Sequence, residues 1–330
     1  MTIDEHERVH ATVSYAGGSR GLGPATLVSG TYEAVAALTN TGDVYFWGRD
    51  YSGETANPET NGATFHAPVR SPYLECVVEV SMSGQYGCAR DIDDDVVCFG
   101  DPPEGMQGGI IPQSVPGFLG ATGLATGALA GVSTSGQAII AGRWSGSLSP
   151  AGSLVQDPPG WPHGEYPRFA TLPTTGGPNC GIDPDGYVWC FGQNELGQVG
   201  DGTWDFAVKP VRVLDLPTAA QLGRYGDRAC ARLDSGRLAC WGRGPLGDGS
   251  TLEDSTPSPV MVEGLTGVVD VALGSASVCA IADEGVACWG WVGGSLEPYP
   301  QWIQVDGTFM QVAALAGAGC ALRDDHEVFC

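Results

Sequence analysis

Eleven cysteines are the residues whose type and spacing give this sequence its clearest chemistry, which is either disulfide formation or metal binding. Ten of them form pairs that lie ten residues apart, or nine apart in one case, on either side of a short polar segment. Residues placed in this way lie opposite each other on the two strands of a β-hairpin, within disulfide distance. We therefore predict the disulfides Cys88–Cys98, Cys180–Cys190, Cys230–Cys240, Cys279–Cys288 and Cys320–Cys330, with Cys76 left as a free thiol.

Zinc is the alternative partner of paired cysteines. Each pair belongs to a different hairpin, however, and such pairs cannot converge on one tetrahedral ion, so we predict no metal site. Structural disulfides are typical of proteins outside the reducing cytosol, although residues 1–13 lack the apolar core of a signal peptide. The cysteines predict a secreted, periplasmic or cell-surface protein.

Aromatic side chains are the second group with recognisable chemistry, and they fall into two sets. One set recurs next to the second cysteine position of each pair and is predicted to pack in the core, because burying such a ring contributes about 2–3 kcal/mol: Trp47, Phe99, Phe191, Trp241 and Trp289. The other set lies in variable connections, where Trp and Tyr are the preferred anchors of interfaces. We predict that this second set binds a partner, with packing over its own loops as the alternative: Tyr51, Trp144, Trp161, Trp204, Phe206, Trp291, Tyr299 and Trp302.

An acidic turn and five histidines are the remaining candidates for chemistry. The segment Asp91–Asp95 has a DxDxD pattern, but it lacks the glycine and distal glutamate of a calcium loop at the required offsets, so we predict a solvated turn. The histidines are scattered and none lies in a nucleophile motif. No phosphate-binding loop with its lysine is present, and no cofactor is predicted. An enzyme with a pocket at a central channel stays open as an alternative.

The charge of the chain excludes two classes of partner. Fifteen Lys and Arg stand against 38 Asp and Glu, which gives a formal net charge of −23. Nucleic-acid binding needs a basic footprint, and an anionic membrane would repel this surface. No apolar run approaches the ~20 residues of a spanning helix. The negative electrostatic field of the chain favours a basic partner.

The elements that position these residues follow from an internal repeat that the cysteines mark. Seven copies consist of two short apolar runs around a polar centre, usually with a glycine near the middle, as in CARLDSGRLACWG from Cys230 to Gly242. Such a segment is typical of a β-hairpin whose turn needs one residue at positive φ. The copies end at Gly48, Gly100, Gly142, Gly192, Gly242, Gly290 and Cys330.

Two more strands accompany each hairpin. A strand-like run precedes most hairpins, such as Val78–Ser81, and a proline-led strand such as Pro68–Arg70 precedes that run. Glycine and proline together number 51 + 23 = 74, too many for a helical protein but suited to many turns. Four strands and about fifty residues per unit indicate a propeller blade. We predict that residues 1–330 form one all-β domain, a seven-bladed propeller with four-stranded blades and hairpin disulfides.

The fourth copy continues into GQNELGQVGDG (192–202), which resembles the regulator of chromosome condensation repeat family at Asn194, Gly197, Gln198, Gly200, Asp201 and Gly202, with Val199 in place of leucine. The fifth copy keeps LGDG (246–249), and the others depart from the motif. The resemblance implies a seven-bladed propeller over nearly all of the chain. The cysteine-bearing form is similar to secreted bacterial members, including propellers like beta-lactamase inhibitory protein II, which bind a protein through loops on one face.

The residues and the resemblance together predict an extracytoplasmic binding protein that recognises a macromolecule, with a protein as the first candidate, through aromatic loops on one propeller face. Rigid loops lose little ordering entropy on binding, which favours such recognition. Three alternatives stay open: an enzyme, a glycan-binding propeller, and an exchange factor for a small GTPase, the role of the nuclear family member. The oligomeric state is not predicted.

Overall fold

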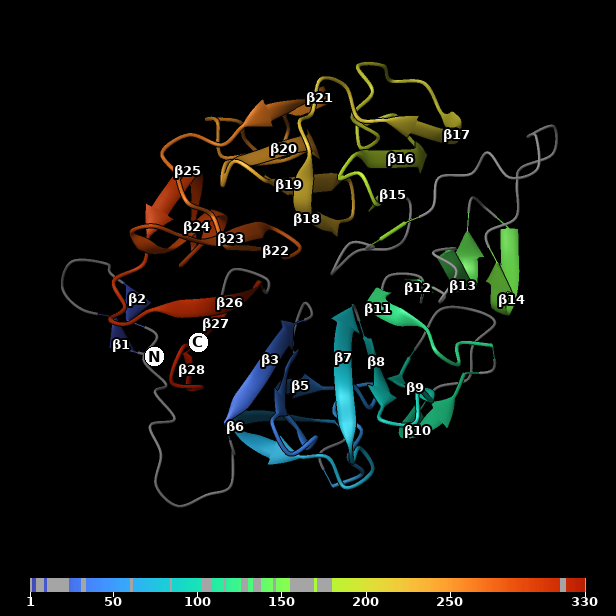
Figure 1. Cartoon of the computed structure of the whole chain (residues 1–330). Coiled ribbons are helices and arrows are strands. Elements are labelled where there is room, and N and C mark those ends of the chain that lie inside the picture. Colours follow the sequence, from blue (N-terminus) through green and yellow to red (C-terminus); the bar gives the residue numbers. More distant parts are fainter. Residues whose placement is uncertain are drawn as a thin grey trace.

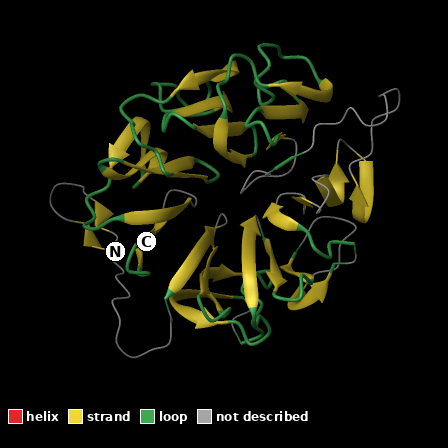
Figure 2. Cartoon of the chain, viewed as in Figure 1, coloured by secondary structure: helices red, strands yellow, loops and turns green. Residues whose placement is uncertain are grey.

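The structure is a computed structural model, and it describes residues 2–3, 9–10, 24–30, 34–59, 62–83, 85–101, 109–115, 117–125, 130–132, 138–144, 147–154, 169–170, 180–314 and 319–329. Every regular element within these residues is a β-strand (Figure 2). The predicted all-β class is confirmed. It follows from short alternating runs that are separated by glycine- and proline-rich turns.

Most of the strands form antiparallel sheets in which the chain runs back and forth between neighbouring strands. Five sheets have four strands, in chain order from one edge to the other. Two of them are β3 (Ala25–Gly30), β4 (Ala34–Thr39), β5 (Val44–Asp50) and β6 (Ala63–Arg70), and then β7 (Val77–Ser83), β8 (Tyr86–Asp91), β9 (Val96–Gly100) and β10 (Gly109–Ser114). The other three are β11 (Thr122–Ala125), β12 (Ala130–Val132), β13 (Ala138–Trp144) and β14 (Ser147–Leu154); β18 (Ala219–Tyr225), β19 (Arg228–Leu233), β20 (Leu238–Arg243) and β21 (Ser255–Met261); and β22 (Asp270–Leu273), β23 (Ser277–Ala282), β24 (Gly285–Val292) and β25 (Ser295–Trp302).

Two sheets have three described strands: β15 (Cys180–Ile182), β16 (Val188–Gly192) and β17 (Ala207–Arg212); β26 (Phe309–Ala314), β27 (Gly319–Arg323) and β28 (Val328–Phe329). A separate pair joins β1 (Thr2–Ile3) to β2 (Val9–His10). The predicted propeller of four-stranded antiparallel sheets is thus present. The number of seven blades stays a prediction, because two sheets have three described strands and the pair β1–β2 is assigned to neither.

The sheets follow one another around a central axis, with the first strand of each sheet innermost (Figure 1). Innermost strands of successive sheets contact each other, as β18, β22 and β26 do. The last sheet contacts the first, since β26 and β27 pack on β3. The first sheet consists of the described strands β3–β6, and β2 pairs with β1 instead of joining it.

The structure shows where a sheet begins and ends relative to the repeat. Each proline-led strand pairs with the hairpin before it in the chain: β6 pairs with β5, β17 with β16 and β21 with β20. These strands are therefore the outermost strands of the preceding sheets. The repeat unit predicted from the sequence begins with the proline-led strand and continues through the apolar run to the hairpin. That unit is consequently shifted by one strand from the sheet in the structure.

The hairpins hold the predicted disulfides. Cys88–Cys98, Cys180–Cys190, Cys230–Cys240 and Cys279–Cys288 are bonded, and each pair lies directly opposite across its two strands. Cys320 is also disulfide-bonded, while its predicted partner Cys330 lies outside the described residues. Cys76 is a free, exposed thiol.

Hairpin turns have the backbone conformation that the repeat predicts. Gly42, Gly186 and Gly236 have φ values of +81°, +87° and +75°. Asp94 and His326, which replace the turn glycine in two copies, also have positive φ, at 65° and 68°. Asp and His tolerate this region better than most residues, so the turn survives the loss of glycine.

The five repeated aromatic residues are buried, as predicted. They fill the space between neighbouring sheets. Trp241 belongs to one apolar cluster with Phe191 and Val199 of the sheet before it, and Trp289 shares a cluster with Leu246. The core is therefore a series of inter-sheet layers.

Candidate interaction surface

One end of the sheets carries most of the exposed aromatic side chains. In an antiparallel meander, the turn between the first two strands and the loop between the third and fourth lie at the same end, which we call the loop end. Gly197 lies against Thr256 and Pro257 at the start of β21, and Gly53 lies against Ile110 at the start of β10. Loop ends of neighbouring sheets therefore lie side by side.

Four of the eight predicted binding residues lie at the loop end and are exposed: Tyr51 (55%), Trp204 (47%), Phe206 (54%) and Trp291 (44%). Tyr51 follows β5, Trp204 and Phe206 lie between β16 and β17, and Trp291 pairs with Leu296 beside the turn from β24 to β25. Among the described residues, Tyr73 is the one comparably exposed aromatic at the opposite end. The aromatic exposure thus distinguishes the two ends.

Of the other four predicted binding residues, the structure describes the side chains of Tyr299 and Trp302. Tyr299 is exposed in the outermost strand β25 rather than in a loop, and its hydroxyl approaches Gly249 of the loop between β20 and β21, so it borders the loop end. Trp302 ends β25, away from the loop end, and packs partly buried against the cluster around Trp289. Trp144 ends β13, but its side chain lies outside the described residues, as does all of Trp161.

A hydrogen-bond network shapes the loop that presents Trp204 and Phe206. The Asn194 side chain is fully buried, accepts from the Val199 N–H at 2.9 Å and donates to the Asp201 carboxylate at 3.1 Å. Asp201 in turn accepts from the Thr203 N–H at 3.0 Å. Buried side chains thus replace the backbone partners that a strand would supply.

The same loop is anchored to the next sheet. Gln198 accepts from the Leu196 N–H at 2.9 Å and donates to Asp227 at 3.2 Å. The backbone carbonyl of Gln198 accepts a hydrogen bond from the indole N–H of Trp241 at 3.2 Å. The motif residues that carry the family resemblance therefore build the loop, and Trp204 and Phe206 project from it.

An arginine strengthens the loop end between two sheets. Arg228 is buried at the start of β19, and its Nη2 donates to the Gly274 carbonyl at 3.1 Å and the Ser277 carbonyl at 3.3 Å. Burial lowers the pKa of Arg228 to about 10, so the group is still charged at neutral pH. It ties β19 to the first turn of the next sheet.

The loops at this end are strongly acidic. The segments 51–62, 193–206 and 244–254 contain eight acidic residues and no Lys or Arg: Glu54, Glu59, Glu195, Asp201, Asp205, Asp248, Glu253 and Asp254. An even spread of −23 over 330 residues would give these 37 residues a charge of about −3. The hairpin turns at the other end are acidic too, as at Asp91–Asp95, so the charge does not distinguish the two ends.

A set of polar side chains that was not predicted from the sequence joins the innermost strands. Glu79 accepts from the Leu124 N–H of the next sheet at 2.6 Å, Asp270 from the Val312 N–H at 2.6 Å, and Gln311 from the Val28 N–H at 2.7 Å. Gln221 donates to Asp270 at 2.6 Å. Each of these four residues stands nine positions before the first cysteine of its copy, and that spacing was the available signal.

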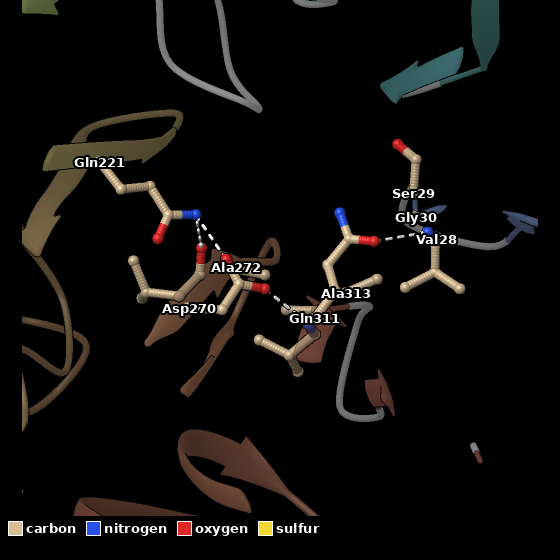
Figure 3. A pocket seen from close by; sticks show the side chains of 11 residues that line it. Val28, Ser29, Gly30, Gln221, Asp270, Ala272, Gln311 and Ala313 are labelled. Carbon is tan, nitrogen blue, oxygen red and sulfur yellow. Dashed lines mark hydrogen bonds between the residues drawn. The ribbon is translucent and has the colours of Figure 1, made fainter. Parts of the chain in front are cut away.

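Three of these side chains, Gln221, Asp270 and Gln311, line a small cavity between β3, β18, β22 and β26 (Figure 3). Its volume is about 50 Å³, and Asp270 is its one carboxyl group. Burial raises the pKa of Asp270, and the hydrogen bonds from Val312 and Gln221 oppose that rise. Small-molecule sites occupy about 300–1,000 Å³, so this cavity offers the enzyme alternative no substrate site.

The acidic turn at Asp91–Asp95 is a hydrogen-bonded hairpin turn. Asp91 accepts from the N–H groups of Asp93 at 2.9 Å and Asp95 at 3.0 Å, and Asp94 pairs with Arg90 at 2.6 Å. The described part of the chain contains no group of three His, Cys, Asp or Glu that could hold a metal ion. His326, in the equivalent turn of the last copy, hydrogen-bonds the Ala25 carbonyl at 2.8 Å.

Comparison with known proteins places the fold among the propellers of the regulator of chromosome condensation, RCC1. Yeast RCC1 (Prp20), in its crystal structure with Kap60, superposes with a TM-score of 0.71 at 17% identity over 92% of this chain and 81% of that one. Human WBSCR16 gives a TM-score of 0.73 at 17% identity over 93% and 87%. Prp20p of Saccharomyces cerevisiae, described with its binding to Gsp1p and histones, gives 0.70 at 17% identity over 92% and 81%.

A sequence relative agrees with this assignment. The mitochondrial RCC1 domain-containing protein RUG3 of Arabidopsis thaliana is 24% identical over an alignment of 284 residues. The alignment covers 78% of this chain and 62% of RUG3, less than two thirds of that relative's length. No protein-family profile matches the chain. The predicted resemblance is confirmed as an RCC1-like propeller fold. Among the described residues there is no helix of the length and hydropathy that would span a membrane.

Proposed function

We propose that this protein binds another protein through the aromatic residues of the loop end. The observation that carries the proposal is the exposure of Tyr51, Trp204, Phe206 and Trp291 on one end of the sheets. Large aromatic side chains on rigid loops are typical interface anchors, since they bury much area and lose few rotamers. The RCC1 structures that share the fold include one bound to a protein partner.

The partner we propose is basic. Eight acidic residues in three loops would attract it and speed its association, and the effect would weaken as salt screens the charges. A lysine or arginine placed over Trp204 or Trp291 would add a cation–π contact beside a carboxylate. We also propose an extracytoplasmic location, which the hairpin disulfides support.

The test compares two triple variants, one at each end of the sheets. W204A/F206A/W291A removes loop-end aromatics, while Y73A/I92A/V269A removes exposed apolar side chains at the opposite end. Both variants should melt near the wild type because all six residues are exposed. Proteins cross-linked to the wild type in a native extract should be recovered at least tenfold less with the first variant and unchanged with the second. Equal recovery with both variants would remove the loop end as the binding surface.

The location is tested separately on the native protein. Mass spectrometry without reductant should find ten of the eleven cysteines blocked, with Cys76 free. Free thiols at the four bonded pairs would contradict an extracytoplasmic location.

A further inference from the structure

The loop after β5 is a disguised copy of the loop after β16. Thr55 N–H donates to Asp50 Oδ1 at 3.3 Å, as Val199 N–H donates to Asn194 Oδ1. Ser52 N–H donates to Glu54 Oε2 at 2.7 Å, as Leu196 N–H donates to Gln198 Oε1. The two loops therefore share one hydrogen-bonded frame, although the sequence GRDYSGE departs from the family motif.

A third correspondence confirms the alignment of the two loops. Glu59 N–H donates to Asn57 Oδ1 at 3.0 Å, as Thr203 N–H donates to Asp201. Ala56 then falls at the position of Gly200, and both have positive φ, at 46° and 78°. Asp50 and Glu54 thus occupy the places of Asn194 and Gln198.

The difference between the loops is the replacement of two amides by two acids. Asp50 is 0% exposed and Glu54 is 3% exposed, and their two carboxyl groups lie within hydrogen-bonding reach of each other. A hydrogen bond between two carboxyl groups requires a proton, because two carboxylates have only acceptors. Two buried carboxylates in contact would also repel each other in a medium that screens poorly.

We propose that Asp50 and Glu54 form a proton-dependent latch on the loop of residues 51–59, which contains Tyr51. The latch holds this loop closed while the pair of acids carries a proton, and the loop opens when both groups are charged. Tyr51 lies between the two acids in the chain and is the exposed aromatic of this loop. As a regulator of recognition, the latch rests on the function proposed above. Binding through Tyr51 would then strengthen as the pH falls.

The surroundings of Glu54 set the sign of this effect. Burial is the largest cause that raises the pKa of Glu54 above 4.5, N–H groups of Ser52 and Glu54 itself oppose it, and contact with Asp50 raises it further. Asp50 is the one charged group among these causes. From the elements packed against the loop, β10 contributes Ile110, and the cluster around Ala56 is apolar.

Because the folded pKa is raised, the closed loop binds more protons than the open loop between the two pKa values. Closure is therefore complete below about pH 4.5 and weakens as the pH rises through the folded pKa of Glu54. Between 4.5 and that folded pKa, each pH unit multiplies the open fraction up to about tenfold, since one proton is released on opening; above the folded pKa neither form holds the proton and the open fraction stops rising.

Hydrogen exchange of the whole protein tests the latch over roughly pH 5 to 8. The protection factor of residues 51–59 should fall up to about tenfold per pH unit in the wild type and stay constant in Glu54→Gln. Two controls are available: Glu59→Gln changes an exposed acid of the same loop and should behave as the wild type, and residues 195–203 of the amide-bearing loop should show constant protection in every variant.

Equal pH profiles for the wild type and Glu54→Gln would overturn the latch. The measurement needs no partner, so its failure is distinct from failure of the proposed function. Loss of partner recovery in the loop-end variant together with equal profiles would leave the binding function standing without the latch. A pH-dependent profile together with no loss of recovery would leave the latch standing without that function.

Discussion

Gly200→Ala tests how the loop motif fits against the next sheet. Gly200 has φ +78°, and a Cβ there would lie 2.7 Å from Nε1 and 2.8 Å from Cδ1 of Trp241. Adding a Cβ at positive φ costs about 1–2 kcal/mol, and displacing a fully buried ring in a packed core costs a further 1–3 kcal/mol, roughly. We expect the free energy of unfolding to fall by about 2–5 kcal/mol.

Two positions in the same chain separate these terms. Gly264 also has positive φ, +73°, but a Cβ there would meet nothing within 4 Å, so Gly264→Ala should lose only about 1–2 kcal/mol. Ala56 occupies the position of Gly200 in the first loop, and its cluster contains Phe99 at the position of Trp241. The smaller ring explains why alanine is accommodated there.

A double-mutant cycle with Trp241→Phe therefore measures the clash directly. Trp241→Phe alone loses the hydrogen bond to the Gln198 carbonyl and some buried area, about 1–3 kcal/mol. The double variant, which reproduces the Ala56 and Phe99 combination, should be more stable than the sum of the single effects by about 1–3 kcal/mol. Urea unfolding followed by fluorescence gives each value. Additivity within about 0.5 kcal/mol would refute the contact between Gly200 and Trp241 as the cause.

Three further predictions concern the innermost strands and the hairpins. Gln311→Leu leaves the Val28 N–H without its acceptor and should cost about 1–3 kcal/mol in urea unfolding; Gln311→Glu keeps an acceptor, as Glu79 does, and an equal loss in both variants would contradict the assignment. Replacing Cys230 and Cys240 together by alanine should lower stability by about 3 kcal/mol, since the disulfide closes a short loop in the unfolded chain; reductant should reproduce the loss in the wild type. Asp270→Asn should remove a pH dependence: its raised pKa makes the folded state bind more protons, so wild-type stability falls as the pH rises from about 4 through the folded pKa. Parallel stability curves for the variant and the wild type would show that Asp270 does not titrate in this range.

The hairpins were predictable because local rules decide them. Two cysteines opposite each other, a turn residue at positive φ and alternating apolar positions lie within thirteen residues of one copy, Cys230–Gly242. The sheet boundary was not predictable in this way, because a repeat in a meander has no intrinsic starting point. Pairing of β6 with β5 depends on long-range contact, so the proline-led strand was grouped with the wrong neighbour.

The loop after β5 escaped sequence comparison for a physical reason. Three of the six residues that make the motif recognisable are glycines, yet Ala56 adopts the positive φ at one of those positions, and acids replace the two amides. The side-chain oxygens of Asp50 and Glu54 still accept the same backbone hydrogen bonds, so the frame is preserved although the residue types differ. The sequence also could not show at which end of a sheet each of the eight candidate binding residues lies. That end depends on strand pairing, which separates Trp302 from Trp204.

A division within each loop connects this architecture to binding. In the loop after β16, Asn194 and Gln198 turn inward and satisfy backbone groups of the loop or the next sheet, while Glu195, Trp204 and Phe206 face solvent. Outward residues make none of the bonds that hold the frame. They can therefore take any side chain that a partner requires at little cost in stability. Inward residues have no such freedom, and replacing an amide by an acid there, as at Asp50 and Glu54, makes the frame itself respond to protons.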